Sequence, residues 1–413
     1  MPEALRPVLV CYISGLDLRR IRPETMPFLA AQRDTSPWVA YRNIPSNELF
    51  PTLMTGVDPT VHGVWGVKIH PRIEEQLVLR PIDRVPDLMT TTAQCIAHFL
   101  TGACDLSAIP PKRRRRFEIT RTKYKRRRKR PDAIYHYGDI PTLLEIVGTE
   151  RSEYFFSSSA KPANGLLRHL FKHRNILEVV ELYTLDRHQQ WHLDDESATN
   201  RMYRVIDDFL MQLNDRCGEL KRSLIIISDH GHQKITKPND VFSLLDSLDI
   251  PDSEYTCFIE VSSARFWFHS DRARKQIPKA LEALAGIELT PWQKMAAYGI
   301  PVSDSAYGEL FAHLDPGHIF FPHDFYQPLA NLFLGLTDRL QRSRLKDPRH
   351  RGNHGHLPHY DVEKSMLLVS DTGFAVTGSG PFTILDVAPS LLQIIGAPVP
   401  AHLPGKAIFG PAG

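Results

Sequence analysis

The chain has 413 residues, 42% of them hydrophobic and 23% charged, which is enough for a large core and more than one compact unit. Its five cysteines are scattered and contain no C-x-x-C pair, which argues against a disulfide framework and a cysteine-based zinc site. No apolar run approaches the roughly 20 residues that span a bilayer, and the apolar stretch near the start is short for a secretory signal. We therefore expect a soluble, cytoplasmic protein, in which any metal site uses histidines and carboxylates.

Charge is distributed unevenly along the chain. The formal net charge is +3, yet residues 112–130 hold 13 Lys and Arg against one acid, Glu118. This basic segment is expected to be a solvated loop or a patch for a polyanion, such as a phosphorylated substrate, a nucleic acid or an acidic membrane surface. Its two aromatic residues, Phe117 and Tyr124, are too few for a base-stacking platform, so we favour a phosphorylated substrate or partner.

Three apolar runs predict strands that are buried on both faces of a parallel sheet. The first is Val8–Ile13, and the others are Leu224–Ile227 and Met366–Val369. Before the second run, apolar residues from Met202 to Leu213 recur at i, i+3, i+4 and i+7, which predicts an amphipathic helix packed on that sheet. Further helices are expected over residues 87–101, 141–148, 275–285 and 385–396.

A helix that leads into a buried strand is typical of α/β folds. We therefore predict a sandwich with a mostly parallel central sheet and helices on both of its faces. Residues 1–249 and 346–413 are expected to form this core, with a basic insert at about 104–135. Residues 250–345 mix strand-like pieces with helices and loops, which indicates a smaller cap subdomain.

Polar residues that directly follow the buried strands are candidates for chemistry, because ligands bind beyond the carboxyl ends of parallel strands. Ser14 and Asp17 follow the first run, and Asp229, His230 and His232 follow the second. An Asp and a His side by side can reach one divalent ion, since zinc accepts both carboxylate oxygen and imidazole nitrogen. The alternative is that Asp229 only caps a following helix.

Five segments form a series of motifs along the chain. They are Pro45-Ser46 with the later Thr55-Gly56 and His62-Gly63, then Thr184–Gln190, Ser228-Asp229-His230-Gly231, Asn353–His356, and Ile384–Ser390. In this order they resemble the type I phosphodiesterase/nucleotide pyrophosphatase family of the alkaline phosphatase superfamily. The resemblance implies an alkaline-phosphatase-like three-layer sandwich and a metal-dependent hydrolase of phosphate esters.

The family resemblance also implies roles for individual residues. It assigns the nucleophile to Ser46, which lies ten residues before the Gly of Thr55-Gly56. One metal set would include Asp186 and His354, and the other would include Ser46 with the pair at 229 and 230. The implied metal is zinc, as two ions, with manganese or magnesium as alternatives. A metal-bound hydroxyl loses its proton more easily than a free one, and two ions neutralise both the attacking and the leaving oxygen.

Two ligands that the family resemblance implies are replaced in this chain. The family's first strand ends in Asp-Gly, but here the sequence reads Ser14-Gly15. Ser14 or Asp17 then substitutes for that carboxylate, and the alternative for Asp17 is that it only caps a helix. The family's Asp-x-x-x-His pair ends in Gln190, and the candidates for the missing ligand are Gln190, His188 and His192. The site then keeps two ions with altered ligands, works with one ion, or belongs to a catalytically degenerate binding or scaffold protein.

The substrate is expected to be a phosphorylated small molecule or a nucleotide-like one. Nucleotide-cleaving relatives place an Asn three residues after the nucleophile, where this chain has Leu49. Asn47 and Glu48 are the candidates for holding the phosphoryl oxygen instead, and the alternative for Asn47 is that it only shapes the turn. The candidates for substrate contacts are Glu48, Trp65 and Lys68. The segment after Ser46 does not match the C/S-x-P-x-R motif of sulfatases, which disfavours a sulfatase. The sequence leaves the oligomeric state and the choice between diester and monoester open.

Overall fold

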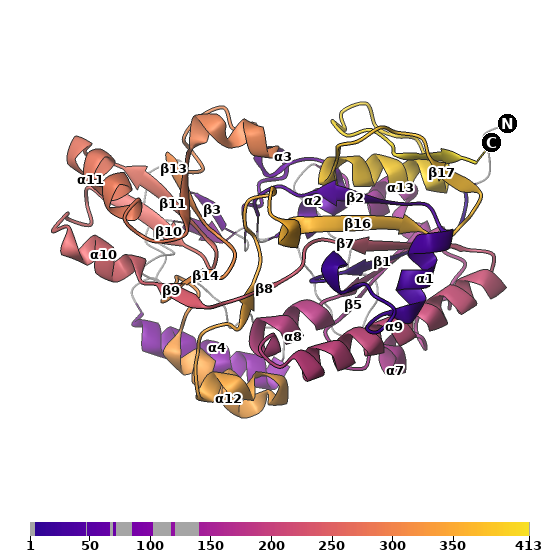
Figure 1. The fold of residues 1–413 in the computed structure, drawn as a ribbon, viewed down its shortest axis with the longest axis horizontal. Helices are drawn as coiled ribbons and strands as arrows, with labels where there is room; N and C mark the ends of the chain where they lie inside the picture. Colours follow the sequence, from indigo (N-terminus) through magenta and orange to yellow (C-terminus); the bar gives the residue numbers. More distant parts are fainter. Residues whose placement is uncertain are drawn as a thin grey trace. The chain divides into compact units, whose positions relative to one another are not determined.

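The computed structural model of the chain describes residues 5–46, 48–66, 69–71, 85–101, 117–119 and 140–412. The chain divides into two compact units, coloured along the sequence in Figure 1. The core unit comprises Met1–Gly63, Arg121–His232 and Pro358–Gly413, and the insert unit comprises Val64–Thr120 and Gln233–Leu357. Most of the predicted basic insert, at 104–116 and 120–135, lies outside the described residues.

The core unit is built on a seven-stranded sheet with the order β18-β2-β16-β7-β1-β6-β5. These strands are β1 (Val8–Ile13), β2 (Trp38–Arg42), β5 (Ser152–Ser157), β6 (Leu177–Leu182), β7 (Ser223–Ser228), β16 (Lys364–Val369) and β18 (Phe382–Thr383). Strands β5, β6, β1 and β7 are parallel, whereas β16 pairs antiparallel with both β7 and β2. The sheet is therefore mostly parallel, as predicted.

The prediction that the third apolar run is a parallel strand was wrong. Met366–Val369 lies within β16, where all but the first residue are buried, but the strand runs against its neighbours. A run of only apolar residues indicates that a strand is buried on both faces of its sheet. Such burial does not specify whether the strand runs parallel or antiparallel to its neighbours.

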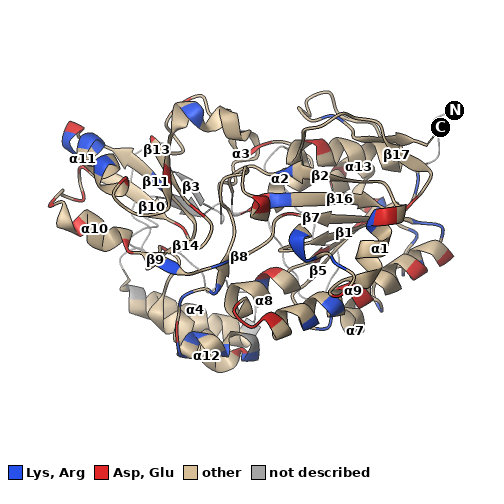
Figure 2. Cartoon of the chain, viewed as in Figure 1, with Lys and Arg blue, Asp and Glu red and all other residues tan. Residues whose placement is uncertain are grey.

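Helices cover both faces of this sheet (Figure 1). On one face, α9 (Glu196–Glu219) packs with α1 (Pro27–Thr35) over a core of β1, β6 and β7 side chains. On the other face, α13 (Val387–Ile395) packs with α2 (Phe50–Thr55) and α6 (Leu143–Val147). Both acidic and basic residues lie along α9 (Figure 2), as expected for a helix with one buried and one solvated face.

Asp207 of α9 caps a helix other than its own. The first residue before α1, Met26, provides no side-chain cap, and the amides of Phe28 and Leu29 donate to the Asp207 carboxylate at 2.8 and 2.9 Å. Asp207 is only 2% exposed, so these two bonds are shielded from water. The carboxylate also carries the charge that a helix N-terminus favours.

Replacing Asp207 with alanine should destabilise the core unit. Asp207→Ala leaves two amides of α1 without an acceptor, and we expect the free energy of unfolding to fall by about 1–3 kcal/mol. Urea denaturation followed by circular dichroism measures this difference. The neighbouring Asp208 is exposed, so Asp208→Ala is the matched control and should stay within about 0.5 kcal/mol of the wild type. Equal effects of the two substitutions would contradict the capping role.

The insert unit has its own sheet and core. Four antiparallel strands lie in the order β10 (Tyr255–Ile259), β11 (Ser263–Phe268), β13 (Leu310–Leu314) and β12 (Ile287–Pro291). Helices α10 (Val241–Ser247) and α11 (Asp271–Leu281) supply apolar side chains to one hydrophobic cluster with this sheet. Elsewhere in this unit, α4 (Asp87–Thr101) packs on α12 (Pro328–Thr337).

Most predicted elements lie where the sequence pattern placed them. The predicted helix over 87–101 is α4, the one over 141–148 contains α6, and the one over 385–396 contains α13. The units divide at His232 and Leu357 rather than at 249 and 345, because α10 belongs to the core of the insert unit. None of the described helices is long and apolar enough to cross a membrane.

Candidate metal centre

The candidate metal centre is built at the carboxyl ends of β1, β6 and β7. Ile13, the last residue of β1, is paired with Leu182 of β6 and Ser228 of β7, so the three strands end level with one another. Ser14 follows β1, Asp229 follows β7, and α8 (Thr184–His192) follows β6 and carries Asp186. The polar residues predicted from the strand ends therefore lie at one edge of the sheet.

Asp229 is held by donors from two strands. The hydroxyls of Tyr12 and Ser14 donate to its Oδ2 at 2.5 and 3.0 Å, and the amides of Gly15 and His230 donate to its Oδ1 at 2.9 and 2.8 Å. Burial opposes ionisation of this carboxyl, but His230 and these donors lower the pKa of Asp229. Asp229 is thus an ionised, fully engaged carboxylate, and not the cap of a following helix.

His230 lies between Asp229 and the next carboxylate of the site. Its Nε2 is 3.2 Å from Asp229 Oδ2, and its Nδ1 is 3.0 Å from the carbonyl oxygen of Gly231. Burial lowers the pKa of His230, but Asp229 outweighs it and raises that pKa to about 9. A neutral ring that donates from Nδ1 to the Gly231 carbonyl leaves Nε2 as a metal ligand, so metal binding displaces a proton.

Asp186 is completely buried at the start of α8. Its Oδ1 lies 3.1 Å from His232 Nε2, and the Gln190 amide donates to its Oδ2 at 2.7 Å. Gln190 also donates to the hydroxyl of Tyr183 at 3.2 Å. Gln190 therefore orients Asp186, as a group bonded to a ligand does.

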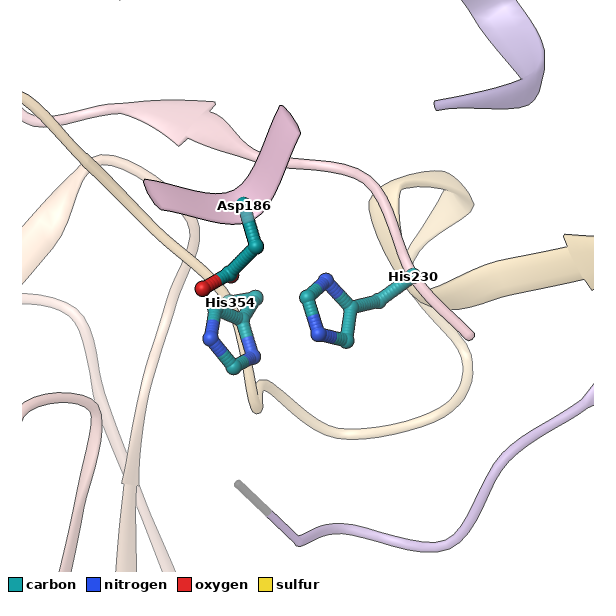
Figure 3. A group of neighbouring side chains, drawn as sticks. All are labelled: Asp186, His230 and His354. Carbon is teal, nitrogen blue, oxygen red and sulfur yellow. The ribbon is translucent and has the colours of Figure 1, made fainter. Parts of the chain in front are cut away.

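Asp186, His230 and His354 each offer one ligand atom, and these atoms all lie within 4.8 Å of one another (Figure 3). One carboxylate and two imidazoles are an ordinary zinc donor set, which leaves a fourth position for water or substrate. The first two residues are buried, and His354 is partly exposed. The donor chemistry of this group therefore fits a divalent ion.

Some residues predicted from the sequence lie outside this group. The Asp17 carboxylate accepts from the Arg19 amide at 2.9 Å and pairs with the Arg19 guanidinium at 2.6 Å, so it caps the short helix Leu18–Arg20. His188 and His192 lie on α8 with their rings 5.1 Å apart, and neither belongs to the metal group. His232 also reaches Asp186, although the sequence placed it only after the strand and not beside Asp186.

Ser46 lies in the connection between β2 and α2. It is 8% exposed, and its Oγ accepts from the Glu48 amide at 3.1 Å. Glu48 contributes to raising the pKa of both Tyr12 and Tyr183, after burial and the nearer carboxylates. Those hydroxyls bond Asp229 and Gln190, so Glu48 lies within electrostatic reach of the metal group.

Three other residues were predicted to contact the substrate or its phosphoryl oxygen. Asn47 and Lys68 are outside the described residues, and Trp65 is a buried residue of the insert unit.

His62 is a structural residue beside the Ser46 segment. It ends α3 (Pro59–His62), and its Nε2 lies 2.9 Å from the hydroxyl of Thr52 in α2. Burial lowers the pKa of His62 to about 3, so the ring is neutral in the folded protein at neutral pH.

His62 should make stability depend on pH. The unfolded chain binds a proton at His62 near pH 6.5, whereas the folded protein does so only near pH 3, so acid favours unfolding within this window. We expect the wild type to lose up to about 1.4 kcal/mol per pH unit more than His62→Gln between pH 6 and 4. Urea denaturation at several pH values tests this, with the exposed His402→Gln as the control. Parallel pH profiles for wild type and His62→Gln would contradict it.

Comparisons with known proteins identify relatives by structure only. No protein-family model and no curated protein sequence matches the chain. Murine ectonucleotide pyrophosphatase/phosphodiesterase 5 is similar with a TM-score of 0.63 and 12% identity, and the human protein with 0.64 and 12%, each over 97% of both chains. Phosphonoacetate hydrolase from Sinorhizobium meliloti 1021 is similar with a TM-score of 0.59 and 11% identity, over 95% of this chain and 96% of that chain.

Proposed function

We propose that this chain, which has the fold of the alkaline phosphatase superfamily enzymes of the nucleotide pyrophosphatase/phosphodiesterase type, is a metal-dependent hydrolase of phosphate esters. The observation that carries the proposal is the group of Asp186, His230 and His354, of which Asp186 and His230 follow the parallel strands β6 and β7. The murine relative has been solved with AMP and the phosphonoacetate hydrolase with phosphonoformate, which supports a phosphorylated small molecule as substrate.

Asp186, His230 and His354 would hold the ion, which we take to be zinc, with manganese or magnesium as alternatives. A bound ion supplies positive charge for a phosphoryl oxygen and lowers the pKa of a hydroxyl beside it. His232 and Gln190 keep the Asp186 carboxylate in place through its two oxygens. This chain's own contribution is a buried and oriented ligand set.

Ser46 is the proposed nucleophile. Its Oγ would form a bond to phosphorus while the bond from phosphorus to the ester oxygen breaks, and the proton given up by Oγ would pass to the leaving alkoxide, which departs as the alcohol. Water would then hydrolyse the phosphoserine, which releases the phosphate and restores the Ser46 hydroxyl. Asn47 is the proposed contact to a phosphoryl oxygen, and Glu48 and Lys68 are the proposed substrate contacts. Trp65 was also expected to contact the substrate. Its surroundings in the insert unit instead support the carboxylate ligand that is proposed in the next subsection.

We further propose that the site holds one ion and not two. A second ion would need Asp229 as a ligand, but both oxygens of Asp229 already accept from Tyr12, Ser14 and two amides. Ser14 adds a hydroxyl that donates to Asp229, where a carboxylate would have added negative charge. The donor set therefore does not fit a second dication.

A cytoplasmic location is proposed on the state of the cysteines. Cys11 and Cys217 are free, buried thiols, as expected for a reducing compartment. The basic segment 112–130 is proposed to attract the phosphorylated substrate, and its residues lie mostly outside the described ones.

Metal content should distinguish one ion from two. We expect about one zinc per chain after dialysis against zinc, measured by mass spectrometry of the metal, and almost none for Asp186→Asn or His354→Ala. The exposed His359→Ala is the control and should keep the wild-type content. The double variant Tyr12→Phe, Ser14→Asp frees Asp229 and restores a carboxylate, so it should take up a second zinc. Two zinc ions in the wild type would contradict the one-ion proposal, and none would favour the scaffold alternative.

Turnover should depend on Ser46. With zinc or manganese present, we expect the wild type to hydrolyse bis-p-nitrophenyl phosphate or p-nitrophenyl phosphate, and Ser46→Ala to lose at least about 10³-fold in kcat. Ser36→Ala, at the end of α1, is the control for loss of a hydroxyl. Comparable rates for Ser46→Ala and wild type would show that Ser46 is not the nucleophile. The metal site would still be tested separately, by the metal content.

A further inference from the structure

The second face of the insert sheet carries buried polar groups. Register pairs Arg265 of β11 with Phe258 of β10 and Phe311 of β13, and pairs Phe311 with Thr290 of β12, so these four side chains form one row across the sheet. The residues next to them along the strands, such as Phe266 and Ala312, belong to the apolar cluster with α10 and α11. A charged residue thus lies on the sheet face opposite that cluster.

Arg265 is a buried cation without a hydrogen-bond acceptor. It is 3% exposed, and within the described part of the chain neither Nη1 nor Nη2 has a hydrogen-bond partner. The guanidinium lies 5.6 Å from the ring centroid of Phe258 and 5.8 Å from that of Trp267, so aromatic faces hold it in position. Buried guanidinium groups are normally satisfied by carboxylate or phosphate oxygens, which leaves this one in need of an acceptor.

Trp65 adds a second donor beside the same row. Its ring is stacked on Tyr307 at 4.3 Å and lies 6.0 Å from Phe311, the cross-strand partner of Arg265. Trp65 is 5% exposed, and its Nε1 also lacks a partner among the described residues. A Cβ built on Gly308, which follows Tyr307, would lie 3.5 Å from the Cβ of Arg265, so this loop passes close to Arg265.

His313 is the third group on this face. It lies two residues after Phe311 on β13, is 2% exposed, and its Nδ1 has no partner in the described structure. Burial, followed by the nearby His356, lowers the pKa of His313 to about 3, so the ring is neutral. A neutral imidazole donates to or accepts from a ligand without adding charge.

We propose that Arg265, Trp65 and His313 bind a small carboxylate with a flat body, at a site independent of the metal centre. The guanidinium fork suits the two oxygens of a carboxylate, and the indole Nε1 is a donor that can only meet an acceptor. Glu260 acts electrostatically on Arg265 and forms a 2.7 Å bond with Ser263, so the surroundings already hold one acid. A monoanion therefore fits better than a phosphate dianion, and the aromatic rings suit a planar group.

Binding of benzoate by the full-length protein tests the proposal. We expect benzoate to bind and to change the fluorescence of the tryptophans, whereas the neutral isostere benzamide binds at least about tenfold more weakly. Arg265→Gln should weaken benzoate binding by at least about tenfold, and Trp65→Phe, which keeps the aromatic packing but removes Nε1, by several fold. The exposed Arg272→Gln on α11 is the matched control and should bind as the wild type does.

Three outcomes would overturn the proposal. The first is that benzoate does not bind. The second is that the Trp65→Phe and Arg265→Gln variants bind benzoate as tightly as the wild type does. The third is that inorganic phosphate binds more tightly than benzoate. Trp65→Phe keeps the test decisive if Arg265→Gln fails to fold. The same titration with Asp186→Asn separates this site from the metal centre, because benzoate binding should persist when metal binding is lost.

Discussion

The bonds between Asp229 and the end of β1 are the constraint on which the candidate site depends. A carboxylate that is 2% exposed remains ionised only because four donors and His230 compensate its burial. Since two of those donors are the side chains of Tyr12 and Ser14, the same bonds fix the ends of β1 and β7 against each other. His230 is the next residue along the chain, so its ring is placed by the same bonds that satisfy Asp229.

This arrangement also explains how the chain departs from the ligand pattern that its motifs resemble. The hydroxyls of Tyr12 and Ser14 donate hydrogen bonds to Asp229. These bonds compensate the negative charge of the carboxylate beside His230. The remaining ligand atoms belong to Asp186, His230 and His354. In the one-ion proposal, hydrogen bonds to Asp229 thus replace one metal position, and Asp186, His230 and His354 form the other.

The fold was largely predictable because its strongest signals are local. Val8–Ile13 is buried on both faces and is apolar throughout, and the pattern from Met202 to Leu213 marks one face of α9. The direction of β16 was not predictable, since burial does not specify it. The contact between His232 and Asp186 joins segments far apart in the sequence and depends on the register of β6 and β7 with β1. Tyr12 was read as part of an apolar strand, although its hydroxyl is the group that bonds Asp229.

The buried cysteines of the core unit affect how metal can be handled in this protein. Burial raises the pKa of Cys11 well above its usual range and that of Cys217 to about 12. Only a thiolate is a good soft ligand or nucleophile, so neither sulfur competes for zinc or reacts readily with alkylating reagents at neutral pH. Thiol chemistry on these two residues can consequently serve as a reporter of unfolding, because they become reactive only when the packing around β1 and α9 opens.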